Sequence, residues 1–105
     1  MKLMTKAIEK AIPALYSQDG KAPEDVQVHV KFFHCLSNYT FFATEYDPEQ
    51  RLFFGLAVAQ EVELGYLSLD ELEATRVKGL PMERDMYMGP MTLAEARAEA
   101  QGVAV

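Results

Sequence analysis

The stretch Glu63-Leu64-Gly65-Tyr66-Leu67-Ser68-Leu69-Asp70-Glu71-Leu72 decides the fold, because it begins as a strand and ends as a helix. Leu64 and Tyr66 continue a period-two apolar pattern from Val62, with Glu61 and Glu63 on the opposite face. Ser68 and Glu71 match the S-x-x-E capping box, which marks a helix start. We therefore expect a strand over residues 61–67 and a helix over residues 69–77.

Three further strands precede this stretch. Alternating or two-sided apolar patterns predict strands over residues 26–33, 39–46 and 51–59. Short links, including the turn Asp47-Pro48-Glu49-Gln50, favour an antiparallel meander. In the first, third and fourth strands, we expect the even-numbered apolar side chains to face the core. Residues 83–88 indicate one more short strand, suited to the edge of the sheet.

Helices are expected at both ends of the chain. Thr5 is suited to cap a helix over residues 5–12, and Thr92 with Glu95 repeats the capping box before a helix over residues 93–101. Gly79 is a candidate to end the helix after the fourth strand. The predicted fold class is α+β: an antiparallel sheet of four to five strands (a meander) packed with two to three short helices.

Length and composition limit the class of protein. The 105 residues predict a single globular domain over residues 1–101, followed by a flexible tail over residues 102–105. No apolar run approaches the ~18 residues of a membrane span, and the first residues lack the apolar segment of a signal peptide. The single cysteine, Cys35, cannot form an internal disulfide. We expect a cytoplasmic protein without a membrane partner.

The net charge of −6 is concentrated in the middle of the chain. Residues 45–73 carry a net charge of −7, because Arg51 is their only basic residue, whereas residues 1–44 carry +1 and residues 74–105 are neutral. A negative field repels phosphates and attracts basic partners. The usual use of such charge is a solvated surface. The more specific hypothesis is one acidic surface for a basic partner, formed by Asp47, Glu49, Glu61, Glu63, Asp70, Glu71 and Glu73.

No motif predicts catalysis or metal binding. His34 and Cys35 are adjacent, but neighbours in an extended chain point to opposite faces, and nothing supplies an orienting acid. His29 and His34, with Glu45 and Asp47, lack recognised ligand spacing. We therefore expect no catalytic residues, no metal and no cofactor. A small enzyme that uses His29, His34 or Cys35 remains an alternative.

Aromatic residues and methionines gather in two parts of the chain. Aromatic residues are dense over residues 32–54, and four methionines lie within residues 82–91. Core packing is the expected use of both groups. A sheet bearing aromatic residues can also stack single-stranded bases, so a nucleic-acid module using Tyr39, Phe41 and Phe53 is a second alternative. The scarcity of nearby basic residues speaks against it.

Several strings, in their order and spacing, resemble the bacterial domain of unknown function 2958 (DUF2958). They span about residues 1–90: Met1-Lys2-Leu3-Met4-Thr5-Lys6, Val30-Lys31-Phe32-Phe33, Ala43-Thr44-Glu45-Tyr46-Asp47, Phe53-Phe54-Gly55-Leu56, the stretch over residues 63–72, and Gly79-Leu80-Pro81-Met82-Glu83-Arg84-Asp85-Met86-Tyr87. The resemblance carries over no catalytic residue. It implies a genetic context of plasmids, conjugative elements and phages, where accessory proteins often act on DNA processing or host defence.

These observations together predict a non-enzymatic accessory interaction protein of a mobile genetic element. Its expected partner is a protein with a basic surface, such as a nucleic-acid-processing or defence complex. The most concrete version is an anti-defence inhibitor whose acidic surface occupies a basic nucleic-acid-binding channel, with carboxylates in the place of phosphates. Direct nucleic-acid binding is not expected.

Overall fold

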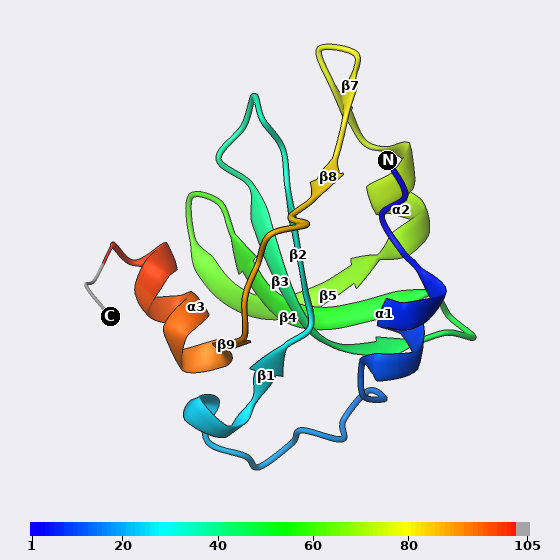
Figure 1. The fold of residues 1–105 in the computed structure, drawn as a ribbon. Coiled ribbons are helices and arrows are strands. Elements are labelled where there is room, and N and C mark those ends of the chain that lie inside the picture. The colour runs from blue at the N-terminus through cyan, green and yellow to red at the C-terminus, as the bar shows by residue number, and fades with distance from the viewer. Residues whose placement is uncertain (103–105) are drawn as a thin grey trace.

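An antiparallel sheet is the centre of the structure. The computed structural model describes residues 1–102, and its main sheet has five strands in the order β5-β4-β3-β2-β8 (Figure 1). Hairpins join β2 to β3, β3 to β4 and β4 to β5, so the predicted meander and the α+β class are confirmed. The five strands are β2 (Val30–Phe33), β3 (Thr40–Asp47), β4 (Leu52–Val58), β5 (Val62–Ser68) and β8 (Glu83–Arg84).

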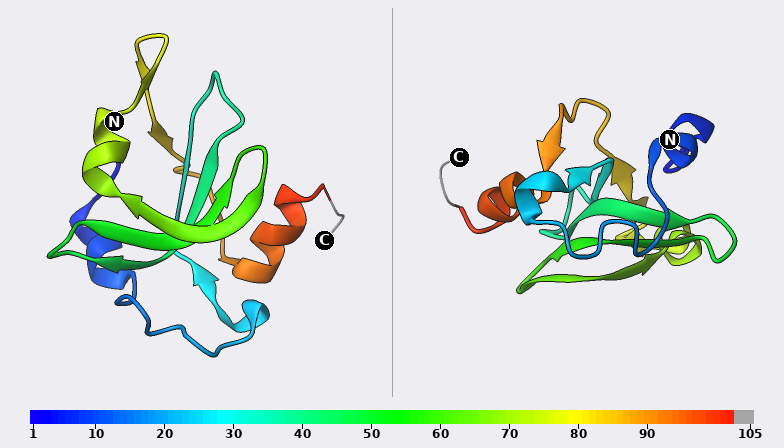
Figure 2. Two further views of the ribbon diagram at one scale, coloured as in Figure 1. Left: turned by 180° about the vertical axis from the view of Figure 1, so that it is seen from behind. Right: turned by 90° about the horizontal axis from the view of Figure 1, so that it is seen from below.

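In the described part of the chain, three helices and two small strand pairs surround this sheet (Figure 2). The helices are α1 (Lys6–Ala11), α2 (Leu69–Ala74) and α3 (Leu93–Ala100), with a 3₁₀ turn, η1 (Pro23–Asp25). The small pairs are β1 (Gln27–Val28) with β9 (Met91–Thr92), and β6 (Arg76–Val77) with β7 (Leu80–Pro81). No helix within residues 1–102 has the length and apolar character that crossing a membrane requires. The predicted tail, apart from Gly102, lies outside the described residues.

Side chains fill the space on both faces of the sheet. The first core lies under α1 and α2, and contains among others Phe32, Phe41, Phe53, Leu69 and Leu72. The second core lies under α3 and the β1–β9 pair, and contains Val26, Val28, Phe42, Leu56, Leu93 and Ala96. Because both faces are covered, β3 is buried along almost its whole length. The apolar residues on both faces of this strand therefore correctly indicate that it is covered on both sides.

The strand predicted over residues 26–33 is broken at His29. Val26, Val28, Val30 and Phe32 are all buried, as alternation predicts. However, the first two belong to the second core and the last two to the first core. The His29 N–H donates to the Ala43 carbonyl at 2.9 Å, outside the regular ladder. At this break the chain passes from the second core to the first core, on the other face of the sheet. A period-two pattern of apolar residues cannot indicate such a change of face.

The prediction that Leu64 and Tyr66 face the core is wrong. They are 44% and 52% exposed, although Val62 on the same face still packs against the second core. The reason is the position of β5 at the edge of the sheet, because α3 packs mainly on β3 and β4. In β4, the odd-numbered Phe53 is fully buried as well, so this strand also serves both faces.

The helix predicted over residues 69–77 is too long. It ends at Ala74, and residues 76–81 form the β6–β7 hairpin instead. Lys78 and Gly79 both have positive φ, 52° and 82°, as a tight two-residue hairpin turn requires. Gly79 therefore serves a hairpin turn and does not end a helix. Similarly, only Glu83–Arg84 of the strand predicted over residues 83–88 pairs with the sheet.

A β-bulge shapes the middle of β3. The pairing with β4 shifts between Ala43 and Glu45, with Ala43 opposite Gly55 and Glu45 opposite Phe54. At Gly55 the two backbones approach so closely that a Cβ there would overlap the Phe42 carbonyl oxygen and lie 2.9 Å from the Ala43 Cα. Gly65, which pairs with Gly55 from β5, has open space instead. Of these two paired glycines, only Gly55 therefore has no room for a side chain.

We expect Gly55→Ala to lower the free energy of unfolding by about 3 kcal/mol or more, because the added methyl meets backbone that no side-chain rotation can move aside. Gly65→Ala is the matched control, and its effect should stay within about 1 kcal/mol. Urea denaturation of both variants measures the difference. Equal losses for the two variants would contradict the close approach of β3 and β4.

Candidate functional site

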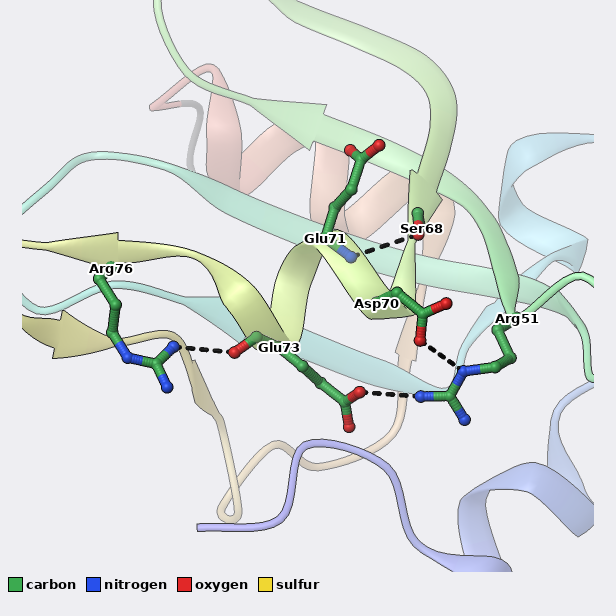
Figure 3. A network of polar contacts seen from close by, with 6 residues as sticks. All are labelled: Arg51, Ser68, Asp70, Glu71, Glu73 and Arg76. Atoms are coloured by element: carbon green, nitrogen blue, oxygen red, sulfur yellow. Dashed lines mark hydrogen bonds and ion pairs between the residues drawn. The ribbon is translucent and has the colours of Figure 1, made fainter.

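Arg51 organises the acidic end of the β3–β4 hairpin. Its Nε donates to Asp70 Oδ1 at 2.7 Å and its Nη2 to Glu73 Oε1 at 2.8 Å (Figure 3). The Arg51 carbonyl also accepts the Leu69 N–H at 2.9 Å. The hydrogen bond to Asp70 raises the pKa of the Arg51 guanidinium. Arg51 thereby attaches α2 to the hairpin, and its single positive charge is shared between two of the predicted site acids.

This role imposes an unusual backbone on Arg51. Its φ is 52°, in the left-handed region that residues with a Cβ seldom adopt. Asp47 supports the turn, since its carboxylate accepts the Glu49 N–H at 3.0 Å and the Gln50 side-chain amide at 2.7 Å. Glycine would fit residue 51 with less strain. The arginine therefore supplies the ion pairs at a conformational cost.

Glu45 belongs to the acidic segment but lies inside the molecule. It is 3% exposed, and its carboxylate accepts the backbone N–H groups of Tyr16 at 2.7 Å and Gln18 at 3.1 Å. These bonds hold the loop after α1 against β3. Strand alternation could not identify this role, because β3 is apolar on both sides of Glu45. The charge of Glu45 is not available to a partner.

Other predicted site residues carry uncompensated charge. Glu49, Glu61, Glu63 and Glu71 are exposed, and none forms an ion pair with any residue that the structure describes. The Ser68 hydroxyl accepts the Glu71 N–H at 3.3 Å, as predicted. The Glu71 side chain nevertheless points away from Ser68, so the second hydrogen bond of the capping box, from the Ser68 N–H to the Glu71 carboxylate, is not formed (Figure 3). The complete capping box is the one at Thr92 and Glu95.

The predicted acids form two groups and not one surface. Asp47, Glu49, Asp70, Glu71 and Glu73 lie near Arg51, where β4 begins and β5 ends. Glu61 and Glu63 lie at the other end of β5, where Glu63 pairs with Ala57. At about 3.3 Å per residue, the strand separates the two groups by about 20 Å. The acids therefore mark the two ends of one exposed strand.

The residues considered for catalysis have different surroundings. His34 Nδ1 accepts the Leu36 N–H at 3.0 Å, so its Nε2 carries the proton and donates to the Leu80 carbonyl at 2.9 Å. Both ring nitrogens are thus hydrogen-bonded to backbone groups, and the bond to Leu80 attaches the β6–β7 hairpin to the end of β2. Cys35 is exposed. Within residues 1–102, no group of three or more His, Cys, Asp or Glu side chains is arranged to hold a metal ion.

The aromatic residues considered for base stacking are mostly inside the protein. Phe41 and Phe53 are fully buried in the first core, and Tyr39 packs against it. Phe41 and Phe53 cannot stack on bases while the core is intact, whereas Tyr39 is partly exposed. Among the methionines, Met82 is buried and Met88 and Met91 are partly buried, as expected for core filling, but Met86 is exposed.

His29 lines a cleft of ≈ 240 Å³ between α1, β2 and the segment after β8. Arg84, Asp85 and Met88 line the same cleft. Burial lowers the pKa of His29 below its ordinary value of 6.5. The folded protein therefore binds a proton at His29 more weakly than the unfolded chain does. As the pH falls through the range in which the unfolded chain takes up this proton, the folded protein loses stability.

We expect the free energy of unfolding to fall as the pH decreases from about 7 to 5, because the unfolded chain protonates His29 before the folded protein does. His29→Gln removes this proton uptake and should flatten the profile over that range. Urea titrations at several pH values compare the two proteins. Parallel profiles for both would contradict the lowered pKa.

Arg51→Gln should lower the melting temperature at low salt, because it removes both ion pairs while it keeps the strained backbone. The difference should shrink at about 1 M salt, where exposed charges are screened. Arg51→Gly is the informative comparison, since it removes the strain as well and should lose less stability than Arg51→Gln. A glutamine variant that melts like the wild type at low salt would contradict the role of the ion pairs.

Comparison with known proteins identifies the family of the chain. A family model described as a protein of unknown function, DUF2958, matches residues 3–103, which is nearly the whole chain. No curated protein and no solved structure matches it. The resemblance noted in the motifs is confirmed, and the chain belongs to the DUF2958 family.

Proposed function

We propose that this protein acts by binding another protein through its acidic residues and not by catalysis. One observation carries the proposal: Arg51, the only base within residues 45–73, is engaged by Asp70 and Glu73, and Glu49, Glu61, Glu63 and Glu71 are exposed without an ion pair within residues 1–102. Exposed like charges that the fold does not neutralise suit association with a basic surface. The engagement of both His34 nitrogens by backbone also favours binding over chemistry.

The more specific form of the proposal concerns the partner. We propose a cytoplasmic accessory protein of a mobile genetic element that inhibits a nucleic-acid-processing or defence complex by occupying its basic channel. Arginine would be the main contact, because its guanidinium pairs with carboxylates as it does with phosphates. The separation of the acids into two groups about 20 Å apart means that such a channel would be contacted at two places.

The test is a pull-down from host lysate at low and high salt with a Glu61→Gln, Glu63→Gln, Glu71→Gln triple variant. We expect the wild type to retain a partner that the variant loses, and that high salt releases. The control removes three exposed charges elsewhere, with Glu9→Gln, Glu24→Gln and Asp25→Asn, and should bind like the wild type. A partner held equally by all three proteins in both salts would contradict the proposal.

A further inference from the structure

The two edges of the sheet differ in how they are protected. One edge is β8, which has only two residues. The other is β5, which has seven residues, no proline, no lysine and an unbroken register with β4. Within residues 1–102, β5 pairs with β4 alone, so alternate residues direct backbone N–H and C=O groups away from the sheet. Sheet proteins usually shorten, charge or cover such an edge.

The side chains of β5 add an apolar contact to this open edge. Leu64 and Tyr66 are exposed on the same face of the strand. The Tyr66 ring packs edge-on against Phe54 with 5.1 Å between centroids, and its hydroxyl donates to the Tyr16 hydroxyl at 3.3 Å. Tyr66 is thus held in place in the free protein. A short apolar row lies at the centre of β5.

The charges at the two ends of β5 indicate the chemistry of its occupant. Glu61 and Glu63 lie at the beginning of the strand, and Glu71, which forms no ion pair within residues 1–102, follows its end beside the Arg51–Asp70 pair. We infer that β5 accepts an extended segment of a partner protein as a sixth strand, and that this segment has apolar residues at its centre and Lys or Arg at both ends. The basic residues would be separated by about six positions, as the length of β5 requires.

A second copy of this chain is a poorer fit to the same edge. Each copy carries a net charge of −6. Antiparallel pairing of two β5 strands centred on Gly65 would place Glu61 of one copy opposite Leu69 of the other, next to Asp70 and Glu71, so acidic residues would lie close to acidic residues at both ends. Like charges across neighbouring strands are destabilising. Charge complementarity therefore favours a basic partner.

This inference rests on the proposed function and adds the mode of binding. The probe is a fluorescein-labelled synthetic peptide, Lys-Arg-Thr-Val-Thr-Val-Thr-Arg-Lys, titrated with the full chain at low salt. Glu63→Lys should weaken its binding at least about tenfold, whereas Glu24→Lys, an equal change of charge at an exposed residue outside the sheet, should weaken it less than about threefold. A peptide with glutamate in place of its basic residues should not bind.

Backbone pairing is tested by methylating one peptide nitrogen at a time. Methylation should weaken binding about tenfold at every second position and much less at the positions between, because only alternate N–H groups face β5. Equal effects at all positions would overturn strand addition and leave acidic binding of the peptide intact. The inference would be overturned if the peptide did not bind, or if sedimentation showed that the protein self-associates through β5. Failure of the lysate pull-down alone would refute the proposed function instead.

Discussion

The close approach of β3 and β4 at Ala43 and Gly55 is the contact on which the rest of the structure depends. The bulge beside it gives Glu45 the position from which its buried carboxylate holds the loop after α1. Without that approach, the last part of β3 would change register, and its hairpin would no longer present Arg51 to α2. One glycine in a buried strand therefore supports both the core and the arrangement of the acidic end.

The arrangement of charge follows from the topology of the sheet. Arg51 pairs with Asp70 and Glu73 of α2, and the bulge places Glu45 inside the molecule. What remains exposed lies mainly at the two ends of β5, an edge strand with apolar side chains at its centre. The acidic character of the segment and the open edge thus belong to the same stretch of chain. This coincidence is what favours a binding protein whose partner is basic and extended.

Sequence patterns predicted the meander, the fold class and the caps at Thr5 and Thr92 because those features depend on local chemistry. They could not predict which strand lies at an edge, and the alternation alone therefore places Leu64 and Tyr66 in the core. They also missed the change of face at His29 and the burial of Glu45, since both depend on contacts between distant residues. For the site, the sequence identified the acidic residues, but only the structure shows which of them form ion pairs with Arg51 and which are exposed without one.

Hydrogen exchange at the β5 amides tests the central claim most directly. In the free protein, the amides of residues 62–68 should alternate between slow and fast exchange, because only those that face β4 are paired. Addition of the basic peptide should slow the fast set and leave β8 unchanged. Uniformly slow exchange in the free protein, or no slowing of β5 with the peptide bound, would contradict an open edge that accepts a sixth strand.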